Sequence, residues 1–559
     1  ILPPLLYSAA LNTSLVDFNA NRRSILLLSV GLVVFTTCGV ALVAHWLVPH
    51  LPWAASFAIG AVVAPPDAVA ATAIGRRIGL PRRIVTILEG ESLLNDATAL
   101  VALRTATLAT VALGTLAFDF VVAAGGGVLV GLTAAFVVGK VRRRLTDPLL
   151  DSGLSFITPF AAYVAAEGIH ASGVIAVVVA GLLLGHKAPI LQTAQSRIQD
   201  RMNWSSIAFL LEGGVFLLIG LQASTIVNNV AAGTLGTGRV VAACGTVLVA
   251  VIVLRMVWVF LSRFLLVRPG PDPETRRRVP WSYTTVLGWA GMRGVVTLAA
   301  AFVIPTNTPN RDLLLLIAFT VTAGTLFIQG LSLPWLARRL QVPSPDPAAD
   351  ALARATLLQQ ASRAAMGALA ELKENDPYGV KGQIKERLER RNFAAWESVG
   401  SKDEETPAEA YARIRQDMIK TEREYVLGVR STGNVPHEVV SQVLAMLDVE
   451  ESMLEYSERE RARVRAVTTS AHLEGGCEHL REVRPRVEPS SPGECADCLR
   501  EGLAWVHLRM CVTCGNIGCC DSSIGRHASA HFRATDHPVM RSAEPGDDWR
   551  WCFVDSLTG

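Results

Sequence analysis

The sequence predicts an all-α polytopic membrane protein, followed by a cytoplasmic helical linker and a small α+β domain. Half of the 559 residues are hydrophobic and only 18% are charged, which is too apolar for an ordinary soluble protein. The apolar residues are confined to positions 1–340, whereas 345–470 is rich in Glu, Arg, Gln and Ala. Positions 473–559 hold most of the Cys and His. These shifts in composition predict three domains.

Eleven apolar windows in the first domain are candidate membrane spans, since about 20 apolar residues cross about 30 Å of hydrocarbon. They lie near residues 1–14, 24–48, 54–75, 84–110, 117–139, 153–168, 171–186, 204–223, 238–264, 282–304 and 312–336. If every window crosses, the Arg and Lys of the loops gather on one side, and the other side holds only Arg239 and Arg311. We expect a plasma-membrane protein embedded among lipids, and the positive-inside rule predicts that its C-terminal region is cytoplasmic. The chain begins with an apolar Ile1, so we expect an upstream part.

Two of the windows are interrupted near their middle. The segment APPDAVAATAI (64–74) contains two adjacent prolines and Asp67, and GWAGMRGVVTLAAAF (288–302) contains three glycines around Arg293. Proline removes a backbone donor, and such breaks leave carbonyls and half-helix ends free to face an ion. Two interrupted spans in distant parts of the chain predict inverted repeats around a midplane site. Asp67 would either neutralise a positive half-helix end or coordinate the ion.

The window LEGESLLNDATAL (88–100) concentrates ionisable residues, which are rare inside spans. Ser92, Asn95 and Asp96 are spaced i, i+3 and i+4, so they share one helix face. A carboxylate beside neutral oxygens suits a proton or a small hard cation. Glu89 is expected at the rim of an access funnel, while Glu212 would be either an access-path acid or a polar contact in the core.

At these residues the sequence resembles the monovalent cation:proton antiporter family of sodium/proton exchangers, over roughly residues 1–340. The segments that carry the resemblance are LPPLLYSAAL (2–11), PPDAVA (65–70), EGESLLNDATAL (89–100), YVAAEGIHASGVIAVVVAGLLLG (163–185) and GWAGMRGVVTLAAA (288–301). The resemblance implies a homodimer whose core domain moves against a dimer-forming domain. It also implies a secondary transporter rather than an enzyme.

The resemblance assigns roles to particular residues. Asp96 would carry a cation or a proton competitively, assisted by Ser92, Asn95 and a carbonyl of the broken span near Pro66. Glu91 and Arg293 would form a buried structural pair.

Arg255 is expected to snorkel to the membrane interface. An Asn before the Asp implies electroneutral exchange for pH and sodium homeostasis, and the choice among Na+, K+ and Li+ stays open. The alternatives are a non-transporting receptor or scaffold that recruits a partner through the C-terminal domain, and a channel.

Residues 350–467 show helical periodicity with mixed charge and predict three or four amphipathic helices packed as a bundle. This bundle would be a spacer that helps dimerisation, or a ligand sensor. The whole chain has no basic stripe with interleaved aromatic residues, so a nucleic acid is not an expected partner.

The C-terminal region contains CADC (495–498) and CVTC (511–514), followed by spaced His residues. On a reducing cytoplasmic side these pairs predict zinc sites rather than disulfides. The region resembles the ubiquitin-specific-protease-type (UBP) zinc finger over residues 475–556. The resemblance implies two or three zinc ions, with the ligand sets Cys495, Cys498, Cys519 and His527; Cys511, Cys514, His531 and His537; and Cys477, His479, Cys552 and Asp555.

Fingers of this type capture the free C-terminus of ubiquitin through an Arg just after a ligand cysteine. Here Cys519 is followed by Cys520 and Asp521, so that Arg is absent, although Trp551 and Phe553 retain an aromatic wall. We therefore expect a different peptide or protein C-terminus as the partner, or a purely regulatory domain.

Overall fold

A computed structural model describes most of the chain. The residues outside the description are 1, 109–112, 232–235, 265–278, 343, 345, 346, 372–375, 377, 401–405, 433, 434, 474–477, 482–486, 506, 521, 522, 545–549, 555, 556 and 559. The chain divides into two compact units, Ile1–Pro345 and Asp346–Gly559.

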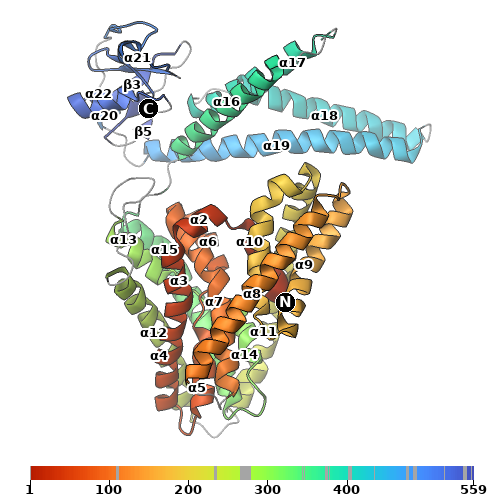
Figure 1. Ribbon diagram of the computed structural model, residues 1–559, viewed down its shortest axis with the longest axis vertical. Coiled ribbons are helices and arrows are strands. Elements are labelled where there is room, and N and C mark those ends of the chain that lie inside the picture. Colours follow the sequence, from red (N-terminus) through yellow and green to blue (C-terminus); the bar gives the residue numbers. More distant parts are fainter. Residues whose placement is uncertain are drawn as a thin grey trace. The chain divides into compact units, whose positions relative to one another are not determined.

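In its described residues the first unit is a bundle of helices (Figure 1). They are α1 (Leu2–Asn12), α2 (Leu15–Ala20), α3 (Arg22–Leu26), the π-helix η1 (Leu27–Gly31), α4 (Leu32–Leu47), α5 (Trp53–Val63), α6 (Ala68–Arg77), α7 (Arg82–Leu108), α8 (Leu113–Arg142), α9 (Pro148–Gly168), α10 (Gly173–Leu191), α11 (Ala194–Ala231), α12 (Thr237–Ser262), α13 (Trp281–Trp289), α14 (Val295–Phe302) and α15 (Arg311–Arg339).

Each of the eleven predicted windows contains a helix or a pair of half-helices. In the described part of the chain, seven helical stretches are by themselves long and apolar enough to cross a membrane: Arg22–Leu47, Val122–Arg142, Pro148–Gly168, Gly173–Leu191, Ala194–Ala231, Thr237–Ser262 and Arg311–Arg339. The other windows hold the short α1, the acid-bearing α7, and the pairs α5/α6 and α13/α14. Large apolar side chains such as Phe136, Phe209 and Leu331 are more than 70% exposed, as lipid-facing residues would be. The all-helical membrane fold is confirmed, and the inverted repeats stay a prediction.

The π-helix η1 is held by a side chain from a distant helix. Trp258 of α12 donates from Nε1 to the carbonyl of Leu27 at 3.0 Å. A Cβ at Gly31 would overlap the Trp258 indole, so this glycine lets the ring approach. A ring inserted at a π-bulge accounts for the local change in helical pitch.

Two apolar cores surround the broken helices. One packs α4 and α5 against α12 and α15, and includes Val63 at the end of α5. The other packs α1 and α10 against α8, α9 and part of α7, and includes Leu93 and Ala97. The central helices α5 and α7 therefore carry their polar residues between two fully packed apolar layers.

The second unit begins with four helices, α16 (Pro347–Glu371), α17 (Val380–Gly400), α18 (Pro407–Thr432) and α19 (His437–Leu473). α16 pairs with α17 and α18 pairs with α19, as Figure 1 shows. Arg415 and Arg423 of α18 bridge to Glu450 (2.7 Å) and Asp448 (2.8 Å) of α19. Hydrogen bonds from these arginines lower the pKa of Glu450 and of Glu451.

The chain ends in a small domain around an antiparallel sheet. Its elements are α20 (Glu478–Arg481), α21 (Ala496–Glu501), β1 (Leu508–Cys511), β2 (Ile517–Cys519), α22 (His527–Thr535), β3 (Val539–Ser542), β4 (Arg550–Cys552) and β5 (Leu557–Thr558). The strand order is β2-β1-β3-β4-β5, with Leu508 opposite Cys519 and Cys511 opposite Met540. The predicted small α+β domain is confirmed.

Candidate functional site

The first break separates α5 from α6. α5 ends at Val63, the chain bends at Ala64 and Pro65, and α6 starts after Asp67, whose backbone is extended. Asp67 is the N-cap residue, and its carboxylate accepts from the backbone N–H of Val69 at 2.8 Å. An aspartate at this position satisfies a free helical N–H and complements the positive end of the helix dipole.

The second break separates α13 from α14 and lies directly against the first. α13 ends at Trp289 and α14 starts at Val295. The backbone N–H of Asp67 donates to the carbonyl of Met292 at 2.7 Å, which joins the two breaks. A Cβ at Gly294 would overlap the Asp67 carboxylate, so this glycine admits the acid to the start of α14. One carboxylate thus lies at the positive ends of both half-helices.

Arg293 lies at the C-terminal end of α5, which is the negative end of that helix dipole. Its guanidinium donates from Nε to the carbonyl of Val63 at 2.9 Å and from Nη2 to that of Ala64 at 3.1 Å, and it also contacts the carbonyl of Gly291. Its backbone N–H donates to Thr325 Oγ1 at 3.0 Å. The last carbonyls of a helix have no intrahelical partner, and here Arg293 supplies it.

The buried ion pair involves a different arginine from the one expected. Glu91 pairs with Arg255 of α12, with Nη2 to Oε2 at 3.0 Å, and the two side chains are 1% and 0% exposed. The predicted Glu91–Arg293 pair is therefore wrong, and so is the interfacial position of Arg255. Arg255 also donates to the carbonyls of Gly288 (3.2 Å) and Leu287 (3.1 Å) at the end of α13. A lone arginine inside an apolar window was the signal that could have identified it, because such a charge requires a buried partner.

We call the place where the two breaks meet, at Asp67 and Met292, the crossing. Residues of α7 contact the crossing through Asn95. Its Nδ2 donates to the carbonyl of Pro66 at 2.9 Å, and its Oδ1 is buried with no hydrogen-bond partner among the described residues. Asp96 is 4% exposed and close enough to Asp67 for their charges to interact. A buried oxygen with no partner needs an explanation, and a bound cation is one. The structure therefore brings Asn95, Asp96, Pro66 and Asp67 together.

Ser92 connects this group to an open pocket. The pocket lies between α1, α6, α7 and α11, and its polar wall includes Asn12, Thr72, Arg76, Glu89 and Ser92. Arg76 and Glu89 form an ion pair across it at 2.5 Å. Ser92 is one helical turn before Asp96, so the two side chains lie on the same face of α7.

The acid on α11 also belongs to the surroundings of the crossing. Glu212 is half-buried and lies close enough to Asp67 for the two charges to interact. Both roles expected for Glu212, an access-path acid and a polar contact in the core, stay predictions.

In the C-terminal domain, two clusters of sulfur and nitrogen donors assemble from residues distant in sequence. In each cluster the potential ligand atoms lie within 4.8 Å of one another. Their members are Cys495, Cys498, Cys519 and His527, and Cys511, Cys514, His531 and His537. These are the two sets that the resemblance implied.

The geometry of both clusters fits a tetrahedral metal ion. His527 Nδ1 lies 3.5, 3.3 and 3.4 Å from the Sγ atoms of Cys495, Cys498 and Cys519. In the second cluster, Cys514 Sγ lies 3.3 Å from His531 Nε2. Zn–S and Zn–N bonds of about 2.3 and 2.0 Å require donor separations of about this size. The first cluster is fully buried, whereas Cys514 of the second is exposed.

The third predicted set is only partly described. Cys552 Sγ lies 3.7 Å from His479 Nδ1. Cys477 and Asp555 lie outside the described residues. The third site stays a prediction.

Comparisons with known proteins agree with both parts of the chain. The family described as sodium/hydrogen exchanger, transmembrane, matches residues 1–339, and the Zn-finger in ubiquitin-hydrolases matches residues 495–557. An uncharacterized Na+/H+ exchanger of Mycobacterium tuberculosis is 33% identical over 470 residues, which cover 81% of this chain and 86% of that protein. A sodium, potassium, lithium and rubidium/H+ antiporter of Bacillus subtilis is 28% identical over 468 residues, covering 79% and 68%.

One solved structure shares the fold of the first unit. A sodium/proton antiporter from Methanocaldococcus jannaschii covers 61% of this chain and 84% of its own, with a TM-score of 0.50 and 16% sequence identity. At this identity the likeness bears on the fold alone.

Proposed function

Because the chain belongs to the sodium/hydrogen exchanger family, we propose that it is a secondary antiporter that exchanges Na+, K+ or Li+ for protons, with Asp96 as the group that carries either ion. The observation that supports this role is the buried Asn95 Oδ1, which has no partner among the described residues and lies next to a buried carboxylate at the crossing of two broken helices. A single carboxylate binds a proton or a cation but not both, so the two ions exchange by competition.

The ligands of the cation would be neutral oxygens that the break supplies. The Pro66 carbonyl accepts one hydrogen bond from Asn95 and keeps a second lone pair, and the Ser92 hydroxyl lies one turn before Asp96. Asp67 would cap the two half-helix starts between which it lies, since a carboxylate complements the positive end of a helix dipole. If Asp67 only caps the helices, Asp96 is the single acid that gains and loses a proton, and it would carry one charge per cycle. That arrangement supports electroneutral exchange.

The remaining buried charges would keep the frame rigid. Arg293 satisfies the C-terminal carbonyls of α5, and Arg255 with Glu91 does the same for α13. The frame consists of α5, α6, α7, α13 and α14. The site would open to one side of the membrane and then to the other as this frame moves against α1 and α11, the other two helices that line the polar pocket. We propose that the moving frame belongs to a homodimer.

Ion flux in liposomes tests the proposal. Liposomes that contain the purified full chain and are loaded with Na+, K+ or Li+ would be diluted into a cation-free buffer. Outward movement of the cation should then drive protons inward and acidify the lumen. The rate should not depend on an imposed membrane potential. Asp96→Asn should abolish this exchange, while Asp17→Asn, an exposed acid on α2, should retain it. Exchange by Asp96→Asn at the wild-type rate would contradict the assignment of Asp96 as the carrier. A rate that changes with the membrane potential would contradict electroneutral exchange. Uncoupled flux that protons do not saturate would instead identify a channel.

The C-terminal domain would hold two structural zinc ions, with a third at His479 and Cys552. When bound, the ions would cross-link β1 and β2 to α22, since the two clusters draw ligands from all three elements. A sheet of this size has few apolar contacts, so bound metal would supply much of its stability. Metal analysis of the full chain should find two or three zinc ions, and Cys498→Ser should lose one of them. A metal-free chain with a folded domain would contradict this assignment.

The domain would act as a cytoplasmic regulatory tail. Phe532 and Phe553 stack with ring centroids 4.8 Å apart, and Ile524 is 80% exposed. These apolar groups support the prediction that the domain binds a peptide or protein C-terminus.

A further inference from the structure

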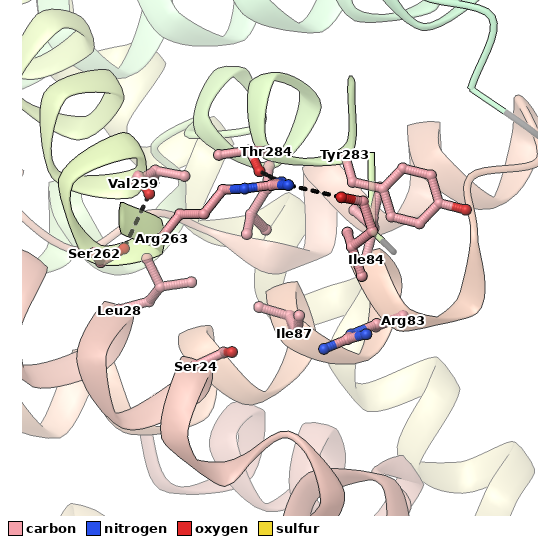
Figure 2. A pocket seen from close by; sticks show the side chains of 12 residues that line it. Ser24, Leu28, Arg83, Ile84, Ile87, Val259, Ser262, Arg263, Tyr283 and Thr284 are labelled. Carbon is pink, nitrogen blue, oxygen red and sulfur yellow. Dashed lines mark hydrogen bonds between the residues drawn. The ribbon is translucent and has the colours of Figure 1, made fainter. Parts of the chain in front are cut away.

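A second cavity lies away from the helix crossing, between α3, α7, α12 and α13 (Figure 2). Its deep wall is apolar: Leu28, Ile87 and Val259 are 3%, 7% and 2% exposed and contact one another. Ser24 and Arg83 line it from the first turns of α3 and α7. The cavity therefore combines an apolar interior with polar groups from the ends of helices.

The charge on this cavity is of one sign. The 12 residues that line it include Arg83 and Arg263 and no acid. Arg263 is committed to the protein, since it donates to the carbonyls of Val279 (2.6 Å) and Pro280 (3.0 Å) and to Thr284 Oγ1. Arg83 makes no ion pair within the described residues, and Figure 2 shows its guanidinium turned toward Ile87 and Ser24. One cationic group is thus available to an anion.

Aromatic residues beside the cavity mark its depth in the membrane. Trp281 at the start of α13 is 48% exposed and lies 5.0 Å from the ring of Phe264, which is 61% exposed. The guanidinium of Arg263 lies over the Trp281 ring at 4.2 Å. Exposed Trp next to snorkelling Arg at the ends of apolar helices is typical of the headgroup region of a bilayer. The anions concentrated at that depth are lipid phosphates.

We propose that this cavity binds an anionic phospholipid, with its phosphate against Arg83 and Ser24 and its apolar part against Leu28 and Ile87. A guanidinium with a neighbouring hydroxyl is a suitable partner for a phosphate, and the apolar wall excludes a fully hydrated ion. The lipid would contact α7, which carries Asp96, and α13, which carries one of the breaks. Binding would therefore stabilise the folded arrangement of the site.

The test uses the purified, delipidated full chain. Native mass spectrometry and thermal unfolding would be followed while phosphatidylglycerol, phosphatidylcholine or inorganic phosphate is added. Phosphatidylglycerol should be retained and should raise the unfolding midpoint, and phosphatidylcholine and phosphate should not. Arg83→Gln should weaken retention by about tenfold, the effect of losing one charged hydrogen bond. Arg77→Gln, which removes an exposed charge at the end of α6, is the matched control and should bind like the wild type.

Ser24→Phe gives a second, charge-neutral variant that fills the cavity. It should lose the lipid while keeping the unfolding midpoint of the lipid-free wild type. Equal retention of both lipids, or unchanged binding by Arg83→Gln and Ser24→Phe, would overturn the proposal. Stabilisation by inorganic phosphate alone would identify a free-anion site instead, and would also overturn it. None of these readouts depends on transport.

Discussion

Two arginines hold the carbonyl ends of the broken helices, and each works in a different chemical setting. The guanidinium of Arg293 contacts only backbone oxygens among the acceptors described, at Val63, Ala64 and Gly291. Arg255 contacts backbone oxygens and also the carboxylate of Glu91. A bidentate guanidinium–carboxylate pair fixes orientation as well as charge, so Glu91 locks α7 to α12.

Removal of one partner of that pair should be costly. Glu91→Gln leaves Arg255 as an uncompensated buried cation, and breaking such a pair costs about 3–5 kcal/mol. Glu89→Gln breaks the more exposed pair with Arg76 and should cost about 1 kcal/mol or less. Thermal unfolding of the purified variants should show a much lower midpoint for Glu91→Gln only. Equal midpoints would mean that the buried pair is not needed for stability.

Gly294 should be sensitive to a single methyl group. A Cβ at this position would overlap Asp67 Oδ2 and lie 2.6 Å from Asp67 Cβ, so the whole Asp67 side chain would have to move. Gly294→Ala should therefore lose most of the exchange activity in liposomes. Gly245→Ala on α12 adds the same methyl group where nothing lies within 4 Å and should leave the activity unchanged. Normal exchange by Gly294→Ala would show that Asp67 moves away without consequence.

At the scale of elements, each helix end in the site has a partner of the right sign. The starts of α6 and α14 meet the Asp67 carboxylate, and the ends of α5 and α13 meet guanidinium groups. A membrane interior offers no water to satisfy these backbone groups, so each break requires such a partner. Asp67 and Arg293 therefore each satisfy the backbone of the break that the other one belongs to.

In the C-terminal domain, α21 positions a metal-ligand candidate. Glu501 at its end accepts from His527 Nε2 at 3.1 Å, which leaves Nδ1 facing the three thiols. A carboxylate that holds the second nitrogen of a ligand histidine raises metal affinity, typically by about 10- to 100-fold. Glu501→Gln should thus release zinc at lower chelator concentration. Glu488→Gln removes an exposed acid that belongs to neither cluster and should not change the release.

For the whole molecule, the alternation of basic loops predicts one orientation. The C-terminal unit should lie on the cytoplasmic side, where its thiols stay reduced. A C-terminal epitope should therefore be reached by antibody only after cells are permeabilised, whereas an epitope in the loop before Arg239 should be reached in intact cells. Reaction of the C-terminal epitope in intact cells would reverse the predicted topology.

Sequence alone determined the membrane class, the positions of both breaks and the concentration of acids on α7, while the two sets of zinc-ligand candidates came from the resemblance to a zinc-finger family. Composition, the placement of proline and glycine, and short motifs are local properties of a chain, so they can be read without coordinates. Tertiary structure decided which arginine meets Glu91, because Glu91 and Arg255 are 164 residues apart in the sequence and only packing brings them together. It also decided that Asp67 serves two helix starts, since the contact with Gly294 exists only where the breaks cross.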